Sequence, residues 1–195
     1  MEPGGHQGIR YLIGSAYLRA GRLEDARASL AAEDNDFPPS RYELALLLLG
    51  EGSFVPAATA LRLGFVENGY IAEMLCGMLH PLPMTVWHGS NFAEPELARE
   101  YVLQYGDLWH RTPGAVAFLR WLHTHPAVMA ERAAILECWE FLLWEHDIER
   151  RRAILDRQQA LVNEIDDRLS AKIAVERTDR FGDRVRPWVH SALST

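Results

Sequence analysis

The amino-acid sequence predicts an all-α protein, a short α-solenoid of helix pairs with a C-terminal helical extension. Residues 8–31 carry apolar side chains at helical spacing on both sides of a tight turn at Gly21. Residues 39–62 repeat this organisation, and residues 147–180 contain neither glycine nor proline. A single helix pair cannot bury its apolar face alone, so each pair requires a stacked neighbour.

The second helix pair repeats key residue types of the first at an offset of 31 residues. The offset places small residues where two helices must approach closely and glycine at the turn, as stacked helix-turn-helix units require. Pro38 and Pro39 separate the pairs and start a new helix. The aligned positions are Tyr11 with Tyr42, Gly14 with Ala45, Tyr17 with Leu48, Gly21 with Gly52, Ala26 with Ala57, and Leu30 with Leu61.

The first pair resembles a tetratricopeptide repeat. Small, aromatic and proline residues fall at the spacing of that repeat, at Gly14, Tyr17, Gly21, Ala26, Leu30 and Pro38. Stacked repeats expose a concave face made from one helix of each pair. The resemblance implies that a partner binds this face, through Tyr11, Ser15, Arg19, Tyr42, Leu46 and Leu49. As an alternative for Leu46 and Leu49, the chain's own later helices cover these two side chains.

The middle of the chain, residues 64–122, alternates helices with loops. A short helix at residues 70–76 precedes an irregular loop that contains Trp87. Helix resumes at Pro95, and Thr112 is expected to cap a further helix that has Pro113 at its first position. Trp87 has two interpretations, because a loop tryptophan either anchors the loop on its own domain or contacts a partner.

Groups of polar, aromatic, proline and small residues follow one another along the middle of the chain: Asn68, Tyr70 and Ile71, then Pro81 and Pro83, then Glu96, Ala98 and Tyr101, and finally Trp109, Arg111, Gly114 and Ala115. By this order of features, residues 7–122 resemble the suppression-of-tumorigenicity seven family and its bacterial tetratricopeptide-like relatives. Gly69 stands where that family usually has proline, and Val116 where it has leucine. The resemblance implies a helical repeat fold and an adaptor-like role, with no catalytic residue to transfer.

The C-terminal part, residues 126–195, is predicted to form a separate helical extension of a repeat domain at residues 1–125. Residues 127–146 form an apolar, aromatic helix, and residues 147–176 are predicted to form one long helix. Val162, Ile165 and Leu169 lie on a narrow heptad-like stripe of that helix. We therefore expect the helix to project and to associate with a partner or with a second copy as a homodimer. The last residues, with Trp188, are expected to form a loosely attached tail.

The charge of the chain argues against general binding to nucleic acid, because phosphate contacts require a basic surface. The net charge is −7, from 20 basic and 27 acidic residues. Residues 147–186 hold ten of the basic and nine of the acidic residues, so the acidic part of the chain is residues 1–146. A regulator that contacts nucleic acid through Arg150, Arg151 and Arg152 remains an alternative function, although acidic residues precede this triplet.

The start of the chain shows no signal peptide, and the longest apolar run, residues 44–49, is far below the ~18 residues of a membrane span. Cys76 and Cys138 lack metal-ligand spacing. We therefore expect reduced cysteines, a cytoplasmic location and no membrane.

Four histidines make the best case for an enzyme or metal site: His80, His88, His123 and His125. Their spacing is weak evidence for zinc, and hydrogen-bonded loop and cap histidines are the simpler interpretation. Glu137, Glu140 and Glu145 are either acid–base groups or a solvated helix face. No phosphate loop, nucleophile elbow or zinc-protease motif occurs. We expect a non-enzymatic protein–protein interaction scaffold without cofactor or metal. A metal-dependent enzyme is the alternative.

Overall fold

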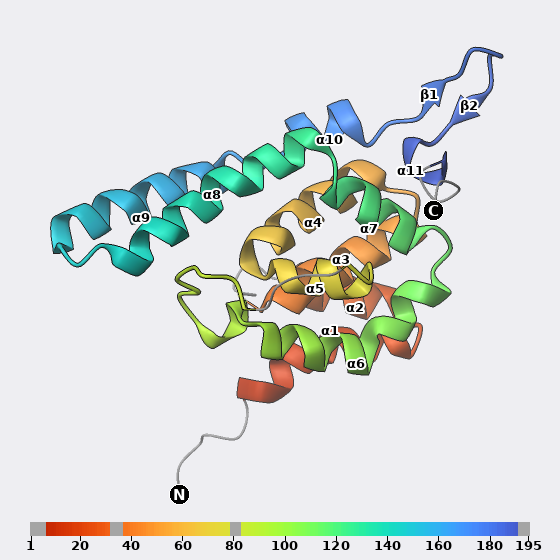
Figure 1. Ribbon diagram of the computed structural model, residues 1–195. Coiled ribbons are helices and arrows are strands. Elements are labelled where there is room, and N and C mark those ends of the chain that lie inside the picture. Colours follow the sequence, from red (N-terminus) through yellow and green to blue (C-terminus); the bar gives the residue numbers. More distant parts are fainter. Residues whose placement is uncertain (1–6, 32–36, 79–82, 191–195) are drawn as a thin grey trace, which may run out of the picture.

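The computed structural model describes residues 7–31, 37–78 and 83–190, and side chains from residue 13 to residue 189 of these ranges. The described residues form eleven α-helices, one short 3₁₀ helix and one two-stranded hairpin (Figure 1). The all-α class predicted from the sequence is confirmed.

Two helix pairs begin the chain. Helices α1 (Gln7–Arg19) and α2 (Leu23–Leu30) form the first, and α3 (Pro38–Gly50) and α4 (Phe54–Glu67) form the second. Gly21 and Gly52 end α1 and α3 with φ angles of 71° and 76°, a conformation that residues with a Cβ rarely adopt. The offset of 31 residues therefore matches two turns of the same geometry.

Small residues lie where the paired helices touch. A Cβ atom added to Gly14 of α1 would overlap the side chain of Leu30 on α2. In the second pair, Ala45 and Ala57 are both fully buried. Close approach of the helices depends on these small side chains because interiors are packed to crystal-like density.

Three more helices, α5 (Gly69–Leu75), α6 (Pro95–Arg111) and α7 (Ala115–His123), complete the body, by which we mean helices α1 to α7. The 3₁₀ helix η1 (Asn91–Ala93) precedes α6. Helix α7 begins later than predicted, since Gly114 at φ 77° precedes its first residue. The hydroxyl of Thr112 donates back to the carbonyl oxygen of Leu108 at 2.9 Å and does not cap α7.

Helices α8 (Pro126–Trp144) and α9 (Ile148–Asn163) form a hairpin that we call the arm. The arm extends away from the body, on the side opposite the β-hairpin (Figure 1). No residue of α9 is buried, since α9 packs chiefly on α8.

The prediction of one long helix over residues 147–176 is wrong. Helix α9 ends at Asn163, and α10 (Asp167–Ile173) starts after Asp166, whose carboxylate accepts a hydrogen bond from the Arg168 backbone nitrogen at 2.9 Å. The buried guanidinium of Arg62 binds the carbonyl oxygen of Asp166 at 2.7 Å, and Ile165 packs between Val66 and Ile135. These contacts require the chain to turn back toward the body.

Residues 177–190 are also more firmly held than predicted. Strands β1 (Arg177–Thr178) and β2 (Arg184–Val185) form a small antiparallel hairpin, and α11 (Pro187–His190) follows. Trp188 is 3% exposed, and its ring lies 4.8 Å from that of Phe54 and 4.9 Å from that of Phe118. The boundary drawn at residues 125 and 126 marks where the chain leaves the body, but α10 and α11 return to pack on α4 and α7.

Within the described ranges, none of the helices has the length and apolar character needed to cross a membrane.

Candidate partner-binding groove

The concave face predicted for the two helix pairs is covered by the chain's own helix α6. Tyr42 is completely buried, and its ring packs 6.4 Å from the rings of Tyr101 and Trp109 on α6. Its hydroxyl donates to the carbonyl oxygen of Asn68 at 2.6 Å. This corrects the expectation that Tyr42 is exposed to a partner.

Ser15 belongs to the same buried contact. Its hydroxyl donates to a carboxylate oxygen of Glu43 at 2.5 Å, and each residue is 1% exposed. Burial raises the pKa of Glu43 to about 7, although the hydrogen bond from Ser15 opposes the shift. Ser15 therefore holds α1 against α3 and is inaccessible from outside.

Among the described residues of this predicted site, only Arg19 has a substantially exposed polar side chain. Its side chain is 46% exposed, lies over the ring of Tyr105 and pairs with Asp107 at 3.1 Å. Both contacts are to α6. Leu46 is buried and Leu49 is partly buried, as their coverage by a later helix would require. Tyr11 lies in α1, and its side chain is outside the described residues.

Trp87 anchors the loop of residues 83–94 on the arm. Its backbone nitrogen donates to the carbonyl oxygen of Trp139 at 3.1 Å, and the guanidinium of Arg151 lies 5.6 Å from its ring centre. Gly89, with a φ angle of 75°, turns the loop against the same ring. The indole is only partly buried. Both interpretations of Trp87 therefore remain compatible with its position.

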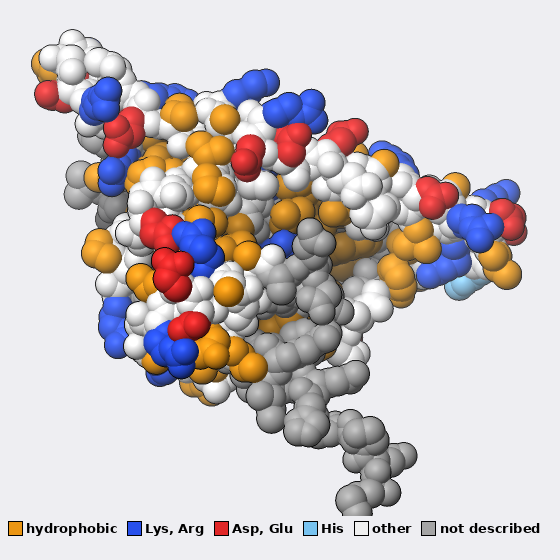
Figure 2. Space-filling model, turned by 180° about the vertical axis from the view of Figure 1, so that it is seen from behind, with side chains coloured by type: hydrophobic (Ala, Val, Ile, Leu, Met, Phe, Trp, Pro, Cys, Tyr) orange, Lys and Arg blue, Asp and Glu red, His pale blue; other side chains and the backbone are white. Residues whose placement is uncertain are grey.

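A groove of about 360 Å³ lies between this loop and the arm. Figure 2 shows apolar side chains in the hollow between the arm and the body. Glu67, His88 and Gln158 contribute polar groups at its edges. The apolar lining consists of Pro38, Val66, Trp87, Phe92, Ala93, Trp139, Leu155 and Val162.

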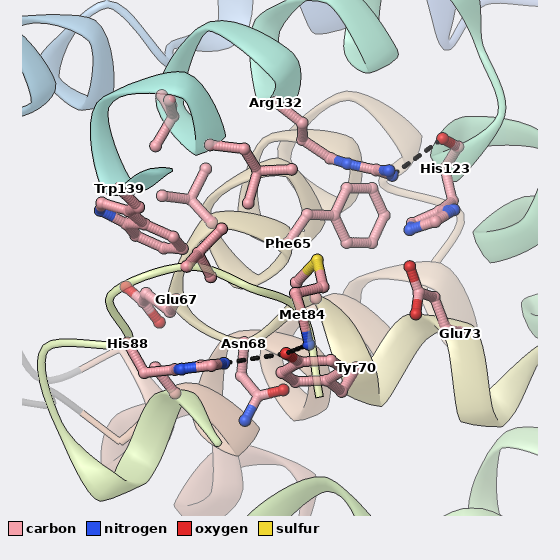
Figure 3. Close-up of a pocket in the computed structure, with 16 residues that line it drawn as sticks. Phe65, Glu67, Asn68, Tyr70, Glu73, Met84, His88, His123, Arg132 and Trp139 are labelled. Carbon is pink, nitrogen blue, oxygen red and sulfur yellow. Dashed lines mark hydrogen bonds between the residues drawn. The ribbon is translucent and has the colours of Figure 1, made fainter. Parts of the chain in front are cut away.

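A cavity of about 30 Å³, room for one or two water molecules, lies directly behind the groove. Figure 3 shows Tyr70 and His88 meeting beside it. The Tyr70 hydroxyl is 2.8 Å from Nε2 of His88 and accepts a hydrogen bond from the Met84 backbone nitrogen, also at 2.8 Å. Burial raises the pKa of Tyr70, so its hydroxyl stays neutral and holds the loop.

Asn68 fixes the far end of the loop from the floor of this cavity. Its side-chain nitrogen donates to the carbonyl oxygens of Phe92 at 2.8 Å and Glu94 at 3.0 Å. These bonds orient the amide, and its oxygen accepts no hydrogen bond from the part of the chain that the structure describes.

Glu73 and Arg132 lie on the other side of the cavity, and each limits the pKa shift of the other. Burial raises the pKa of Glu73 and lowers the pKa of Arg132, and the attraction between the two opposes both shifts. Arg132 also donates to the carbonyl oxygen of His123 at 3.0 Å (Figure 3). The polar groups around the cavity thus serve mainly to join α5, α7, α8 and the loop.

The histidines do not converge on a metal-ligand geometry in the described ranges, where no group of three or more His, Cys, Asp or Glu side chains is suitably placed. His125 accepts a hydrogen bond from the Ala127 backbone nitrogen at 3.3 Å and caps α8. His88 belongs to the loop contact and His123 packs on Phe65. His80 lies outside the described residues.

Several carboxylates and arginines of the arm have local partners. Glu137 pairs with Arg157 at 2.9 Å, and Glu145 accepts hydrogen bonds from the backbone nitrogens that follow it. Glu140 is exposed. Arg151 donates to the carbonyl oxygens of Leu142 and Glu145, at the end of α8. Arg150 and Arg152 are exposed, so the triplet does not form one continuous basic patch.

The proposed association stripe is turned toward the chain's own body. Val162 lines the groove, Ile165 is 7% exposed in a cluster with Val66 and Ile135, and Leu169 packs on the main core. The stripe is therefore largely used within one molecule, which corrects the expectation of a free face.

Sequence reasoning missed Phe92 and Trp139 as groove residues. Phe92 follows Trp87 by five positions in the same loop and packs on Phe37, whereas Trp139 reaches the groove from α8 through tertiary packing. Comparison of the chain with family models, with curated proteins and with solved structures finds no match.

Proposed function

We propose that the chain is a non-enzymatic interaction scaffold that binds an apolar segment of another protein in the groove between the loop and the arm. The observation that carries this proposal is that Trp87, Phe92 and Trp139 line an open groove, whereas the concave face is filled by α6. Tryptophan and other large aromatic residues supply much of the binding energy at protein interfaces.

The groove has the size and composition of a binding site. Ligand pockets measure roughly 300–1,000 Å³ and are mostly apolar with a few placed polar groups, which describes this groove of about 360 Å³. Its two walls come from different parts of the chain and are held together by the bond between Trp87 and Trp139. This bond fixes the loop on α8, which reduces the entropy that the loop loses when a partner binds.

Two further parts of the proposal rest on sequence resemblance. The helix pairs are taken as degenerate tetratricopeptide-like repeats, and the chain as a relative of the suppression-of-tumorigenicity seven family with an adaptor-like role in the cytoplasm. The paired turn glycines support the repeat, since Gly21 and Gly52 have matching conformations.

Site-specific photo-crosslinking in the native host tests the groove. A photoreactive amino acid replaces Gln158 in the groove or, as a matched control, the exposed Glu100 on α6. We expect a defined protein adduct at position 158 that is absent at position 100, and that Leu155→Asp suppresses it without lowering the melting temperature. Equal adducts at both positions, adducts that survive Leu155→Asp, or none at position 158 would contradict the proposal.

A further inference from the structure

Helix α8 is rich in apolar residues, and only one side of it is covered. Val128, Ile135, Cys138 and Leu142 are buried against the body and α9. On the outward side, Phe141 is 50% exposed and Trp144 is 67% exposed. A surface helix normally carries charged and polar residues on the face opposite its buried stripe, so two exposed aromatic residues on that face are unusual.

The outward residues form one seam. Five exposed residues follow each other at intervals of three, four, four and three positions, which is the 3.5-residue period of helices that pack along their length. From one end of α8 to the other, they are Ala130, Ala133, Glu137, Phe141 and Trp144. Alanines occupy one end of this seam and aromatic residues the other, with Glu137 at its centre.

We propose that the outward seam of α8 binds the same seam of a second copy of this chain, antiparallel, with the twofold axis at Glu137. In that arrangement Trp144 lies on Ala130 of the second copy, and Phe141 lies on Ala133 of the second copy. Each large side chain meets a small one, so both ends fill space efficiently. A parallel pair would place Trp144 against Trp144 and leave the alanines apart.

The charges at the centre fit the same arrangement. Glu137 pairs with Arg157 of α9 at 2.9 Å, and the two side chains are 50% and 55% exposed. At the twofold axis the two Glu137–Arg157 pairs come together and compensate each other, and the exposed Glu140 lies at the edge of the seam. Each Glu137 carboxylate already has a guanidinium beside it, and this positive charge offsets the repulsion between the two copies of Glu137.

The proposed interface and the groove occupy different faces of the arm. Phe141 follows the groove residue Trp139 by two positions, which is a rotation of about 200° around the helix. The dimer therefore leaves the groove open, and the inference stands independently of the proposed function.

Analytical ultracentrifugation over a wide concentration range tests association. The unmodified protein is expected to reach twice the chain mass of 22.1 kDa. The double variant Phe141→Asp with Trp144→Asp is expected to stay at the chain mass and to keep its helicity and melting temperature, because both side chains are exposed. Leu103→Asp, at a residue of α6 that is 91% exposed, is the matched control and should still dimerise.

Cysteine crosslinking tests the antiparallel register. Both native cysteines are buried and should not react. A short bismaleimide should link two Glu137→Cys chains, whose cysteines meet at the axis. Two Ala130→Cys chains should remain unlinked, because 14 residues of helix separate their cysteines by about 21 Å. A monomer at every concentration, a dimer that survives the double variant, equal crosslinking at both positions, or none at position 137 would overturn the proposal.

Discussion

The guanidinium of Arg62 on α4 lies against the carboxylate of Glu131 on α8, through two hydrogen bonds of which the first, from Nε to Oε1, measures 3.0 Å. The Arg62 side chain is 1% exposed. It also donates to the carbonyl oxygen of Asp166 and, at 2.9 Å, to the hydroxyl of Ser170. One buried side chain therefore connects the body, the base of the arm and the start of α10.

Replacing Arg62 with methionine should lower the free energy of unfolding by about 3–5 kcal/mol, because the change leaves the partly buried Glu131 carboxylate without its partner. Arg99→Met is the matched control, since Arg99 forms an exposed pair with Glu96 and its loss should cost less than about 1 kcal/mol. Urea denaturation measures both. Equal effects of the two changes would show that the Arg62 contacts are unimportant for stability.

Glu43 should make the protein less stable as the pH rises. Its pKa is raised by burial to about 7 from an ordinary value near 4.5, so the folded protein holds this proton more tightly than the unfolded chain does. Stability should therefore fall between about pH 4.5 and about pH 7 and level off above, with a total loss of about 3 kcal/mol.

Glu43→Gln removes this titration and keeps an acceptor for Ser15. The difference in unfolding free energy between the variant and the unmodified protein should grow across that pH range, in favour of the variant at alkaline pH. Glu100→Gln, at an exposed position, is the control. A difference that stays constant with pH would rule out a raised pKa at Glu43.

Enlarging the small residues between paired helices should destabilise both pairs. Ala26→Leu and Ala57→Leu each replace a side chain that is 0% exposed, and overpacking of this kind costs about 1–3 kcal/mol. Ala28→Leu, on the exposed side of α2, should leave the melting temperature nearly unchanged. If both buried changes are as harmless as the exposed one, the assigned register of the pairs is wrong.

Trp188→Ala should cost about 3–5 kcal/mol, as expected for a large aromatic side chain removed from a core. Its ring fills the space between Phe54 and Phe118. Phe181→Ala, in the nearby hairpin, removes an aromatic ring that is 74% exposed and should change stability by less than about 0.5 kcal/mol. Thermal unfolding compares the two, and a similar shift for both would contradict the packing of α11 on the body.

The elements that could be predicted from the sequence are those specified by local signals. Gly21, Gly52 and Pro38 mark the turns and the start of α3, because glycine and proline restrict the backbone wherever they occur. The break after Asn163 carries a weaker local signal, the capping residue Asp166. It is stabilised by Arg62, which is more than 100 positions away, and no pattern within the helix reports that contact.

The candidate site was less predictable for a similar reason. Helical spacing places Tyr42 and Ser15 on one face of the first two pairs, but it does not show which later helix covers that face. Helix α6 does so, through Tyr101, Trp109 and Asp107. Trp87 was recognisable as a loop aromatic residue, whereas its neighbours Phe92 and Trp139 could be identified only from the packed structure.

The weak attachment of α9 has a consequence for how the molecule opens. Helix α9 has no buried residues, so few apolar contacts are lost when its backbone hydrogen bonds break. Its local opening therefore requires less free energy than global unfolding. Amide hydrogens of α9 should therefore exchange with deuterium earlier than those of α4, whose residues include much of the core. A protease should likewise cut the arm first and leave the body as a resistant fragment.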